Sequence, residues 1–429
     1  MTQLGEAVSP PEVDKPEEKE EEIKSVKIRI SMFFDGTLNN KFNTEHRLSD
    51  DDIYKENKKT DNSYENDLTN VAIMEKYIAD AAGYDNTLSC YIEGPGTIND
   101  EDDKFFGYAL GTGKSGVVKK VRKAIDESIN KIKNSVKDTE LIIEEISIDV
   151  FGFSRGAAGA RYFIHEALDS GKKPIKEELI SKGFKVKKIK IKFAGLYDTV
   201  SSHGVIYSND VSDLKLRSVF HADKVIQLAA AEEHRERFSL TTIDSAGFNG
   251  RQIYLPGVHS DIGGSYVDGS SEEFIIYKSY SKKKAENEMD RLIDSGWYKK
   301  NEINLEVKKQ KRHHTSITKA KLLVSKKNIG NKYSRIPLNI MGDFAGETGI
   351  NLNGEFSSQC VIPGDLSKAK QIIDKYISDE KKSEPSDWSS NDEWHKELRS
   401  GYLHFSSKYS IGLNPRFNNN VRVRKLYHG

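Results

Sequence analysis

The stretch SIDVFGFSRGAAGARYF, residues 147–163, decides the fold. An apolar run rich in β-branched residues leads into Gly152-x-Ser154-x-Gly156, and a small-residue segment follows. This order predicts a strand, a sharp turn and a helix, with glycines on both sides of the serine relieving crowding in a strained backbone. Because a Gly-x-Ser-x-Gly pentapeptide is common by chance, its meaning depends on the rest of the chain.

The charge and cysteine content argue against several classes of function. Lys plus Arg equals Asp plus Glu at 66 each, so no net field favours nucleic acid. The 429 residues can form two or three domains or one elaborated α/β domain. Cys90 and Cys360 are the only cysteines and no Cys/His cluster suggests zinc, so we expect no disulfide framework, metal or cofactor, although one bridge stays open.

The N-terminal residues 1–25 are rich in Pro and Glu and predict a disordered acidic leader. They contain neither the basic nor the apolar region of a Sec signal peptide. No run approaches the ~18 consecutive apolar residues of a membrane-spanning helix. We therefore expect a soluble chain made in the cytoplasm, whose contact with any membrane is peripheral.

Apolar segments alternate with helical segments along the first two thirds of the chain. Strands are expected within 25–40, 88–97, 141–154, 185–200 and 251–266, and helices near 70–82, 117–133, 155–168 and 224–238. This alternation predicts a mainly parallel, doubly wound sheet flanked by helices, with the chemistry at the carboxyl ends of its strands.

The domain prediction places a catalytic core at 26–270. The remaining residues, 271–429, begin with a Lys-rich stretch that we interpret as a helical insertion or cap, followed by a C-terminal segment that packs on the core. An apolar helix is expected at 334–345 within that segment.

Three residues that hydrolysis uses stand at the ends of expected strands. Ser154 lies at the strand-to-helix turn, Asp198 ends GLYDTV and His259 ends the strand of PGVHSD. The order Ser, Asp, His is that of α/β-hydrolases. It predicts that Ser154 attacks, that His259 takes and returns the proton, and that Asp198 orients the imidazole.

Each of these assignments has a competing interpretation. Asp198 could instead cap a turn, because DTV after a strand suits an Asx-turn. Asp261 or Ser260 could be the functional residue of GVHSDIGG, with His259 structural, and His404 in GYLHFSS could supply the base.

The expected oxyanion hole draws on two segments. The helix after Ser154 directs the N–H of Arg155 at the site. The second donor is expected from FFDGTLNN, as the N–H of Gly36 or Thr37, while Asp35 is a candidate for ordering that loop instead.

The segment ALGTGKSG resembles a phosphate-binding loop but fails its spacing. Five residues before Gly113 stands Tyr108, and the nearest glycine, Gly107, is out of register. We interpret the segment as a glycine-rich turn beside the active site.

Seven ordered motifs between Lys27 and Tyr266 carry a family resemblance. They are FFDGTLNN, YIEGPGT, GYALGTGKSG, FGFSRGAAGAR, GLYDTV, AAAEEHRERF and PGVHSDIGGSY. Together they resemble the catalytic domain of type VI secretion phospholipase effectors, the family 1 lipase effectors. Ser265 departs from the pattern, since many members carry a third glycine there. Many members also have a larger C-terminal membrane-associating region, whereas the residues after Tyr266 in this sequence are Lys-rich and poor in long apolar segments.

The resemblance implies an α/β-hydrolase-like fold and cleavage of a phospholipid acyl ester by a serine esterase of phospholipase A type, with Ser154, Asp198 and His259 on the family's motifs. It also implies an antibacterial toxin carried by a type VI spike component into the periplasm of a target cell, with a cognate immunity protein. Two other functions stay open: a non-catalytic adaptor that binds through the Lys-rich region 278–312, and an intracellular esterase of a small soluble ester.

Overall fold

The computed structural model describes residues 24–57, 62–101, 103, 114–169, 171, 174–201, 211–312, 315–410, 412–419 and 421–429. The expected leader falls almost entirely outside these residues, and so does most of the glycine-rich segment GYALGTGKSG.

A six-stranded parallel sheet forms the centre of the molecule, in the order β3-β1-β4-β5-β6-β8. Its strands are β1 (Ser25–Phe34), β3 (Asn86–Ile92), β4 (Ile142–Phe153), β5 (Lys185–Tyr197), β6 (Ala222–Ala230) and β8 (Gly250–Leu255). The last eight residues of β4 are all buried, as expected for a strand covered on both faces. The predicted mainly parallel α/β sheet is confirmed.

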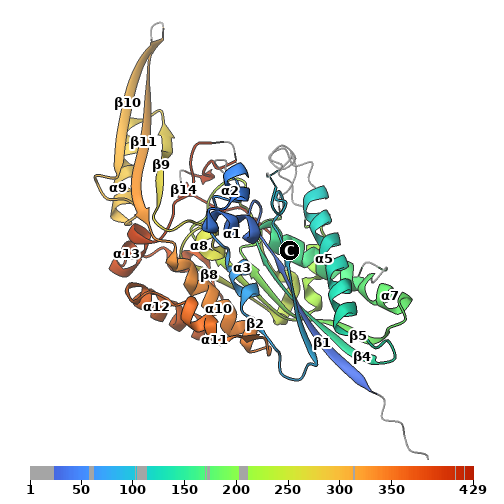
Figure 1. Ribbon diagram of the computed structural model, residues 1–429. Helices are drawn as coiled ribbons and strands as arrows, with labels where there is room; N and C mark the ends of the chain where they lie inside the picture. Colours follow the sequence, from blue (N-terminus) through green and yellow to red (C-terminus); the bar gives the residue numbers. More distant parts are fainter. Residues whose placement is uncertain are drawn as a thin grey trace, which may run out of the picture.

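Helices cover both faces of this sheet (Figure 1). The helices α5 (Lys114–Ser135), α6 (Arg155–Ile164) and α7 (Pro174–Ser181) share one buried cluster with the sheet. A second cluster on the other face includes α3 (Asn70–Lys76), α8 (His259–Gly263) and α10 (Arg335–Gly346). The expected helix at 334–345 corresponds to α10, which contacts β5, β6, α3 and α8.

The helix predicted over 224–238 is wrong. Residues up to Ala230 form β6, which pairs in parallel with both β5 and β8, and the segment after it is a loop. The Ala and Glu residues of AAAEEHRERF favour a helix locally, but pairing inside the sheet overrides this weak preference.

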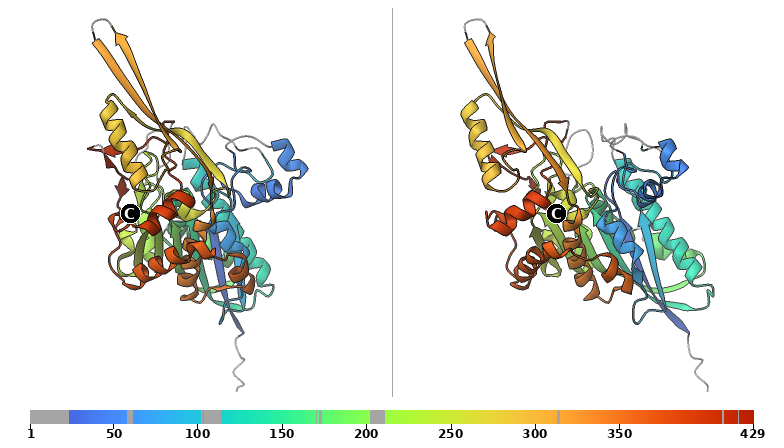
Figure 2. Two further views of the ribbon diagram at one scale, coloured as in Figure 1. Left: turned by 90° about the vertical axis from the view of Figure 1, so that its left-hand side faces the viewer. Right: turned by 60° about the vertical axis from the view of Figure 1, so that its left-hand side comes forward.

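A separate antiparallel sheet follows the central one, in the order β10-β11-β9. It consists of β9 (Ser270–Ser279), β10 (Ile303–Arg312) and β11 (Thr315–Ile329), with α9 (Lys282–Asp294) packed against it. The strands β10 and β11 project from the body as a hairpin (Figures 1 and 2). The predicted helical insertion therefore holds for α9 only. The rest is strand, because Ala320, Leu322 and Val324 recur every second residue and are buried on one face.

The C-terminal region returns to the central sheet. The helices α11 (Gly354–Gln359), α12 (Ser367–Ser378) and α13 (Glu393–Gly401) lead into a tail with the short strands β13 (Phe417–Asn418), β14 (Val421–Arg422) and β15 (Leu426–Tyr427). The last of these pairs with β7 (Leu240–Thr241) beside the central sheet. The remaining elements are α1 (Lys41–Ser49), α2 (Asp52–Asn57), and the paired strands β2 (Ile78–Ala79) and β12 (Asn351–Leu352). In the part of the chain that is described, no helix combines the length and the apolar character needed to cross a bilayer.

Candidate active site

Ser154 occupies a strained turn between β4 and α6. Its backbone angles, φ 59° and ψ −125°, are rarely adopted by a residue with a side chain. The turn is held by its neighbours: the N–H of Ser154 donates to the carbonyl of Tyr197 (3.0 Å), and its own carbonyl accepts from the N–H of Val200 (3.2 Å). The serine elbow is thus tied directly to the loop that carries Asp198.

The two glycines around Ser154 permit close backbone approach. A methyl group on Gly152 would lie 2.5 Å from the Cα of Ala157, and one on Gly156 would lie 2.2 Å from the carbonyl oxygen of Asp35. These distances agree with the prediction that the glycines relieve crowding. They also place the first turn of α6 against the end of β1.

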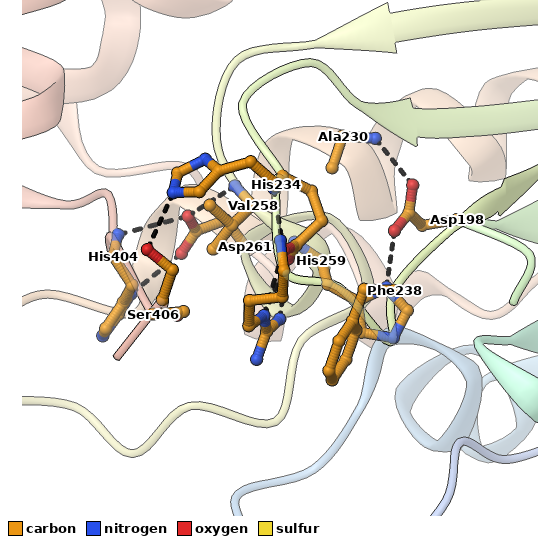
Figure 3. A network of polar contacts seen from close by, with 12 residues as sticks. Asp198, Ala230, His234, Phe238, Val258, His259, Asp261, His404 and Ser406 are labelled. Atoms are coloured by element: carbon orange, nitrogen blue, oxygen red, sulfur yellow. Dashed lines mark hydrogen bonds and ion pairs between the residues drawn. The ribbon is translucent and has the colours of Figure 1, made fainter. Parts of the chain in front are cut away.

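Asp198 and His259 meet at the carboxyl ends of β5 and β8. The Nδ1 of His259 lies 2.5 Å from the Oδ2 of Asp198, and both side chains are buried (Figure 3). The His259 ring packs on Phe153, with 4.6 Å between ring centroids, and edge-on against Phe238 at 5.0 Å. The residue next to the serine therefore contacts the imidazole.

Burial and charge set the protonation of this pair. Burial opposes the charge of Asp198, but the guanidinium of Arg424 and the hydrogen bonds from His259 and Arg424 outweigh it and hold the pKa of Asp198 well below its usual range. Burial lowers the pKa of His259, and its hydrogen bond to Asp198 offsets this only in part. The pair thus combines an ionised carboxylate with a neutral imidazole near pH 7.

Two further donors hold Asp198, and the sequence analysis anticipated neither. The N–H of Ala230 donates to Oδ1 (2.8 Å), and Arg424 donates to Oδ1 through Nη1 (2.6 Å) and to Oδ2 through Nη2 (2.7 Å). Arg424 stands 226 positions further along the chain, in a tail with no motif to mark it.

The loop after β6 fixes the turn that carries His259. The carboxylate of Glu232 accepts from the N–H of Gly257 (2.8 Å), and that of Glu233 accepts from the N–H of His259 (3.3 Å). Glu233 is in turn paired with Arg235, at 2.7 Å from Oε2 to Nη2. The AAAEEHRERF motif thus positions His259 from a loop and not from the helix that its composition suggested.

His404 belongs to a second Asp–His pair. Its Nδ1 lies 2.8 Å from the Oδ1 of Asp261, and its Nε2 lies 2.8 Å from the Oγ of Ser270. The other oxygen of Asp261 accepts from the N–H groups of Val258 (3.0 Å) and His404 (3.2 Å). Figure 3 shows the network with Asp198 at one end and His404 at the other. The structure therefore brings His259, and not His404, to Asp198.

Asp35 orders the loop after β1. Its Oδ1 accepts from the N–H of Gly36 (2.7 Å) and the hydroxyl of Thr69 (2.8 Å), and its Oδ2 accepts from the hydroxyl of Tyr91 (2.5 Å). Burial raises the pKa of Asp35 to about 6 against these hydrogen bonds. Since the N–H of Gly36 is already engaged, it is a poorer oxyanion donor than its neighbour Thr37.

Thr37 and Arg155 offer unengaged N–H groups near the elbow. Among the described residues, no hydrogen bond uses the N–H of Thr37, and its buried Oγ1 has no partner either. The N–H of Arg155 lies in the first turn of α6, where N–H groups have no helical partner. Burial and the nearby Arg237 lower the pKa of the Arg155 side chain to about 10.

No group of three or more His, Cys, Asp or Glu side chains within the described ranges is placed to hold a metal ion. Cys90 and Cys360 are both free and buried.

The family model described as the Tle1-like phospholipase effector catalytic domain of the type VI secretion system matches residues 165–289. The resemblance to the Tle1-like phospholipase effectors is confirmed. The match to the Tle1-like model includes Asp198 and His259 but begins after Ser154. The interpretation of Ser154 therefore rests on the geometry of its turn alone.

A solved type VI effector has a similar fold. The structure of the Tle1 effector bound to the VgrG spike from the type 6 secretion system is 21% identical, with a TM-score of 0.64 over 95% of this chain and 94% of that one. An uncharacterised protein from Pseudomonas aeruginosa is 15% identical, with a TM-score of 0.42 over 84% of this chain and 52% of that one. No curated protein matches the sequence. The Tle1 likeness, the parallel sheet and its flanking helices confirm the α/β-hydrolase-like fold class.

Proposed function

We propose that the protein is a serine hydrolase that cleaves the acyl esters of membrane phospholipids and acts as an antibacterial effector of type VI secretion. The observation that carries the proposal is the hydrogen bond between Asp198 and His259, formed beside the strained turn of Ser154. The resemblance to the Tle1-like phospholipase effectors supports the phospholipid substrate and the secretion route.

The first chemical step uses the tautomer that Asp198 selects. An ionised carboxylate only accepts hydrogen bonds, so Nδ1 of His259 carries a proton and Nε2 is free to act as base. Nε2 takes the hydroxyl proton as Oγ of Ser154 attacks the ester carbonyl. The developing oxyanion is stabilised by the N–H groups of Arg155 and Thr37. Ser154, Asp198 and His259 are thus proposed as the triad, and Asp35 as the residue that shapes the Thr37 loop.

The second half of the reaction releases the products. His259 returns its proton to the leaving glycerol oxygen, which frees a lysophospholipid and leaves an acyl group on Ser154. A water molecule then attacks the acyl-serine, with His259 again as base, and releases the fatty acid. No metal or cofactor enters either step.

Delivery and membrane contact follow from different observations. The solved Tle1 effector is bound to the VgrG spike, and on that likeness we assign this chain a spike partner of the same kind. Delivery into the periplasm of a target cell and a cognate immunity protein are proposed from the resemblance to the type VI phospholipase effectors. For peripheral membrane contact, the β10–β11 hairpin is the favoured element. Lys308 stands directly opposite Lys319 on it, so the hairpin holds two like charges side by side.

The decisive experiment compares wild-type protein with Ser154→Ala on mixed phospholipid vesicles and follows fatty-acid release. We expect release by the wild type and a loss of about 10⁴-fold or more in the variant, with an unchanged thermal melt. A soluble short-chain ester serves as a second substrate. If the wild type cleaves neither substrate, or if Ser154→Ala retains full activity, the serine-hydrolase proposal fails. Activity on the soluble ester alone would favour an esterase of small substrates.

A further inference from the structure

We propose that Arg424, delivered by the C-terminal tail, is a positioning residue of the hydrolase centre that fixes the carboxylate of Asp198 against His259. This inference rests on the proposed function. It adds to the Ser–Asp–His triad a fourth residue, whose contact with Asp198 is direct and whose effect on Ser154 passes through two other side chains.

The guanidinium of Arg424 has a partner for each of its nitrogens. Nη1 and Nη2 bind the two oxygens of Asp198, at 2.6 and 2.7 Å, and Nε donates to the carbonyl of Phe238 at 2.8 Å. Nη1 also reaches the carbonyl of Ala230 at 3.2 Å. A planar fork held at three nitrogens fixes the plane of the carboxylate and directs Oδ2 at His259.

The same contacts connect Arg424 to the imidazole from a second side. The carbonyl that accepts from Nε belongs to Phe238, whose ring lies edge-on against His259. Arg424 therefore supports both the acceptor of the imidazole proton and one wall of the ring's pocket.

The backbone on both sides of Arg424 is fixed. Before it, the N–H of Val423 donates to the carbonyl of Arg416 (3.1 Å); after it, the carbonyl of Lys425 accepts from the N–H of Leu240 (3.0 Å). The Arg424 side chain is only 7% exposed. The tail thus forms part of the site and presents the fork in one place.

The charges around His259 come in balanced pairs. The groups that act on the imidazole are Asp198, Arg235 and Glu233, and Arg424 lies behind Asp198. Arg424 neutralises Asp198 as Arg235 neutralises Glu233. Removing Arg424 leaves one uncompensated negative charge, which stabilises the imidazolium, so the pKa of His259 rises.

The test uses Arg424→Gln and Arg424→Lys, with Arg422→Gln as the matched control. Arg422 stands two positions away and is also buried in an ion pair, but its partner is Glu288 and not a residue of the site. Each protein is assayed on the soluble short-chain ester for kcat, KM and their pH dependence, and its thermal melt is recorded.

We expect Arg424→Gln to lower kcat by about 10²-fold with little change in KM. This loss is smaller than the roughly 10⁴-fold loss that follows when a triad carboxylate itself is replaced by an amide, because Asp198 is still present. The acid limb of the variant's pH profile for kcat moves to higher pH, because the pKa of His259 rises. Arg424→Lys keeps the charge but not the fork, so it restores the acid limb more fully than kcat. Arg422→Gln lowers the melting temperature and leaves kcat and the pH profile in place.

Two results would overturn the inference: a kcat for Arg424→Gln within threefold of that for Arg422→Gln, or an unmoved acid limb. If Arg424→Gln does not fold, Arg424→Lys decides, and wild-type kcat in that variant refutes the role of the fork. Failure of the hydrolase proposal is recognised separately, because it shows in wild type and Ser154→Ala without reference to Arg424.

Discussion

Two buried Asp–His pairs flank the turn that begins α8, and only one of them has the surroundings that the proposed hydrolase mechanism requires. In both, a histidine Nδ1 faces a carboxylate, at 2.5 Å for His259 with Asp198 and 2.8 Å for His404 with Asp261. Asp198 has Arg424 as a counter-charge, and its pKa is low. For Asp261, burial dominates and raises the pKa despite His404, and no Arg or Lys pairs with it among the described residues.

The backbone beside each pair differs as much as the charge. Nε2 of His404 faces Ser270, so Ser270, His404 and Asp261 are hydrogen-bonded in the same order as the three residues of a catalytic triad. Ser270, however, begins the strand β9 and is paired with Ile329, whereas Ser154 sits in a strained turn ahead of a helix N-terminus. A hydrogen-bonded Ser–His–Asp set is therefore not sufficient to make its serine a nucleophile. A serine held in a strained turn, with unengaged N–H groups nearby, is also needed.

The largest predicted difference between the pairs is in catalysis. His259→Ala removes the proposed base and should lower kcat/KM on the soluble ester by about 10⁴-fold or more. It should also lower the free energy of unfolding by about 1–3 kcal/mol, because Asp198 loses a buried hydrogen-bond partner. His404→Ala should keep kcat/KM within about tenfold and lower the free energy of unfolding by about 1–3 kcal/mol, because buried donors and acceptors lose their partner.

Both variants are measured by steady-state kinetics and by urea unfolding. An equal collapse of kcat/KM in His404→Ala, with folding intact, would give the base to His404 and reverse the assignment of the two pairs.

A second prediction concerns how the two carboxylates contribute to stability as pH changes. The pKa of Asp198 is lower in the folded protein, so its contribution is present above the unfolded value of about 3.9 and is lost as pH falls below it. The pKa of Asp261 is raised, so its ionisation costs stability as pH rises from about 4. The two carboxylates should therefore show opposite slopes.

Urea unfolding of Asp198→Asn and Asp261→Asn, measured at pH values below and above about 4, checks the sign of each change in the free energy of unfolding. Asp198→Asn should cost about 3–5 kcal/mol at pH 7, since Arg424 keeps a buried charge without its partner, and less at the acid end. The cost of Asp261→Asn should shrink as pH rises. Parallel slopes for the two variants would contradict the difference in environment.

The sequence predicted the elements that carry the first pair because local patterns mark them. The strand–Gly-x-Ser-x-Gly–helix order and the polar residues at strand ends place Ser154, Asp198 and His259 on one edge of a parallel sheet. It did not separate His259 from His404, since both follow apolar segments and only the fold shows which carboxylate each one meets.

The rest of the site depends on contacts that no local pattern encodes. Arg424 meets Asp198 across 226 positions, and Glu233 holds the His259 turn from a segment whose Ala and Glu content favours a helix. The Lys-rich hairpin was predicted as helix for a related reason: lysine favours helices weakly, and alternation with buried apolar residues decides in favour of strands.

The smallest predicted effect tests whether the second triad-like arrangement is only structural. Ser270→Ala removes one hydrogen bond to His404, so we expect kcat within about twofold of wild type and a loss of about 1 kcal/mol in the free energy of unfolding. A fluorophosphonate probe should label the wild type and Ser270→Ala equally and leave Ser154→Ala unlabelled. Labelling of Ser154→Ala at Ser270 would show a second reactive serine. The pairing of Asp261 with His404 would then be a second catalytic pair and not a support for the α8 turn, and the strain at Ser154 would no longer explain why one serine reacts and the other does not.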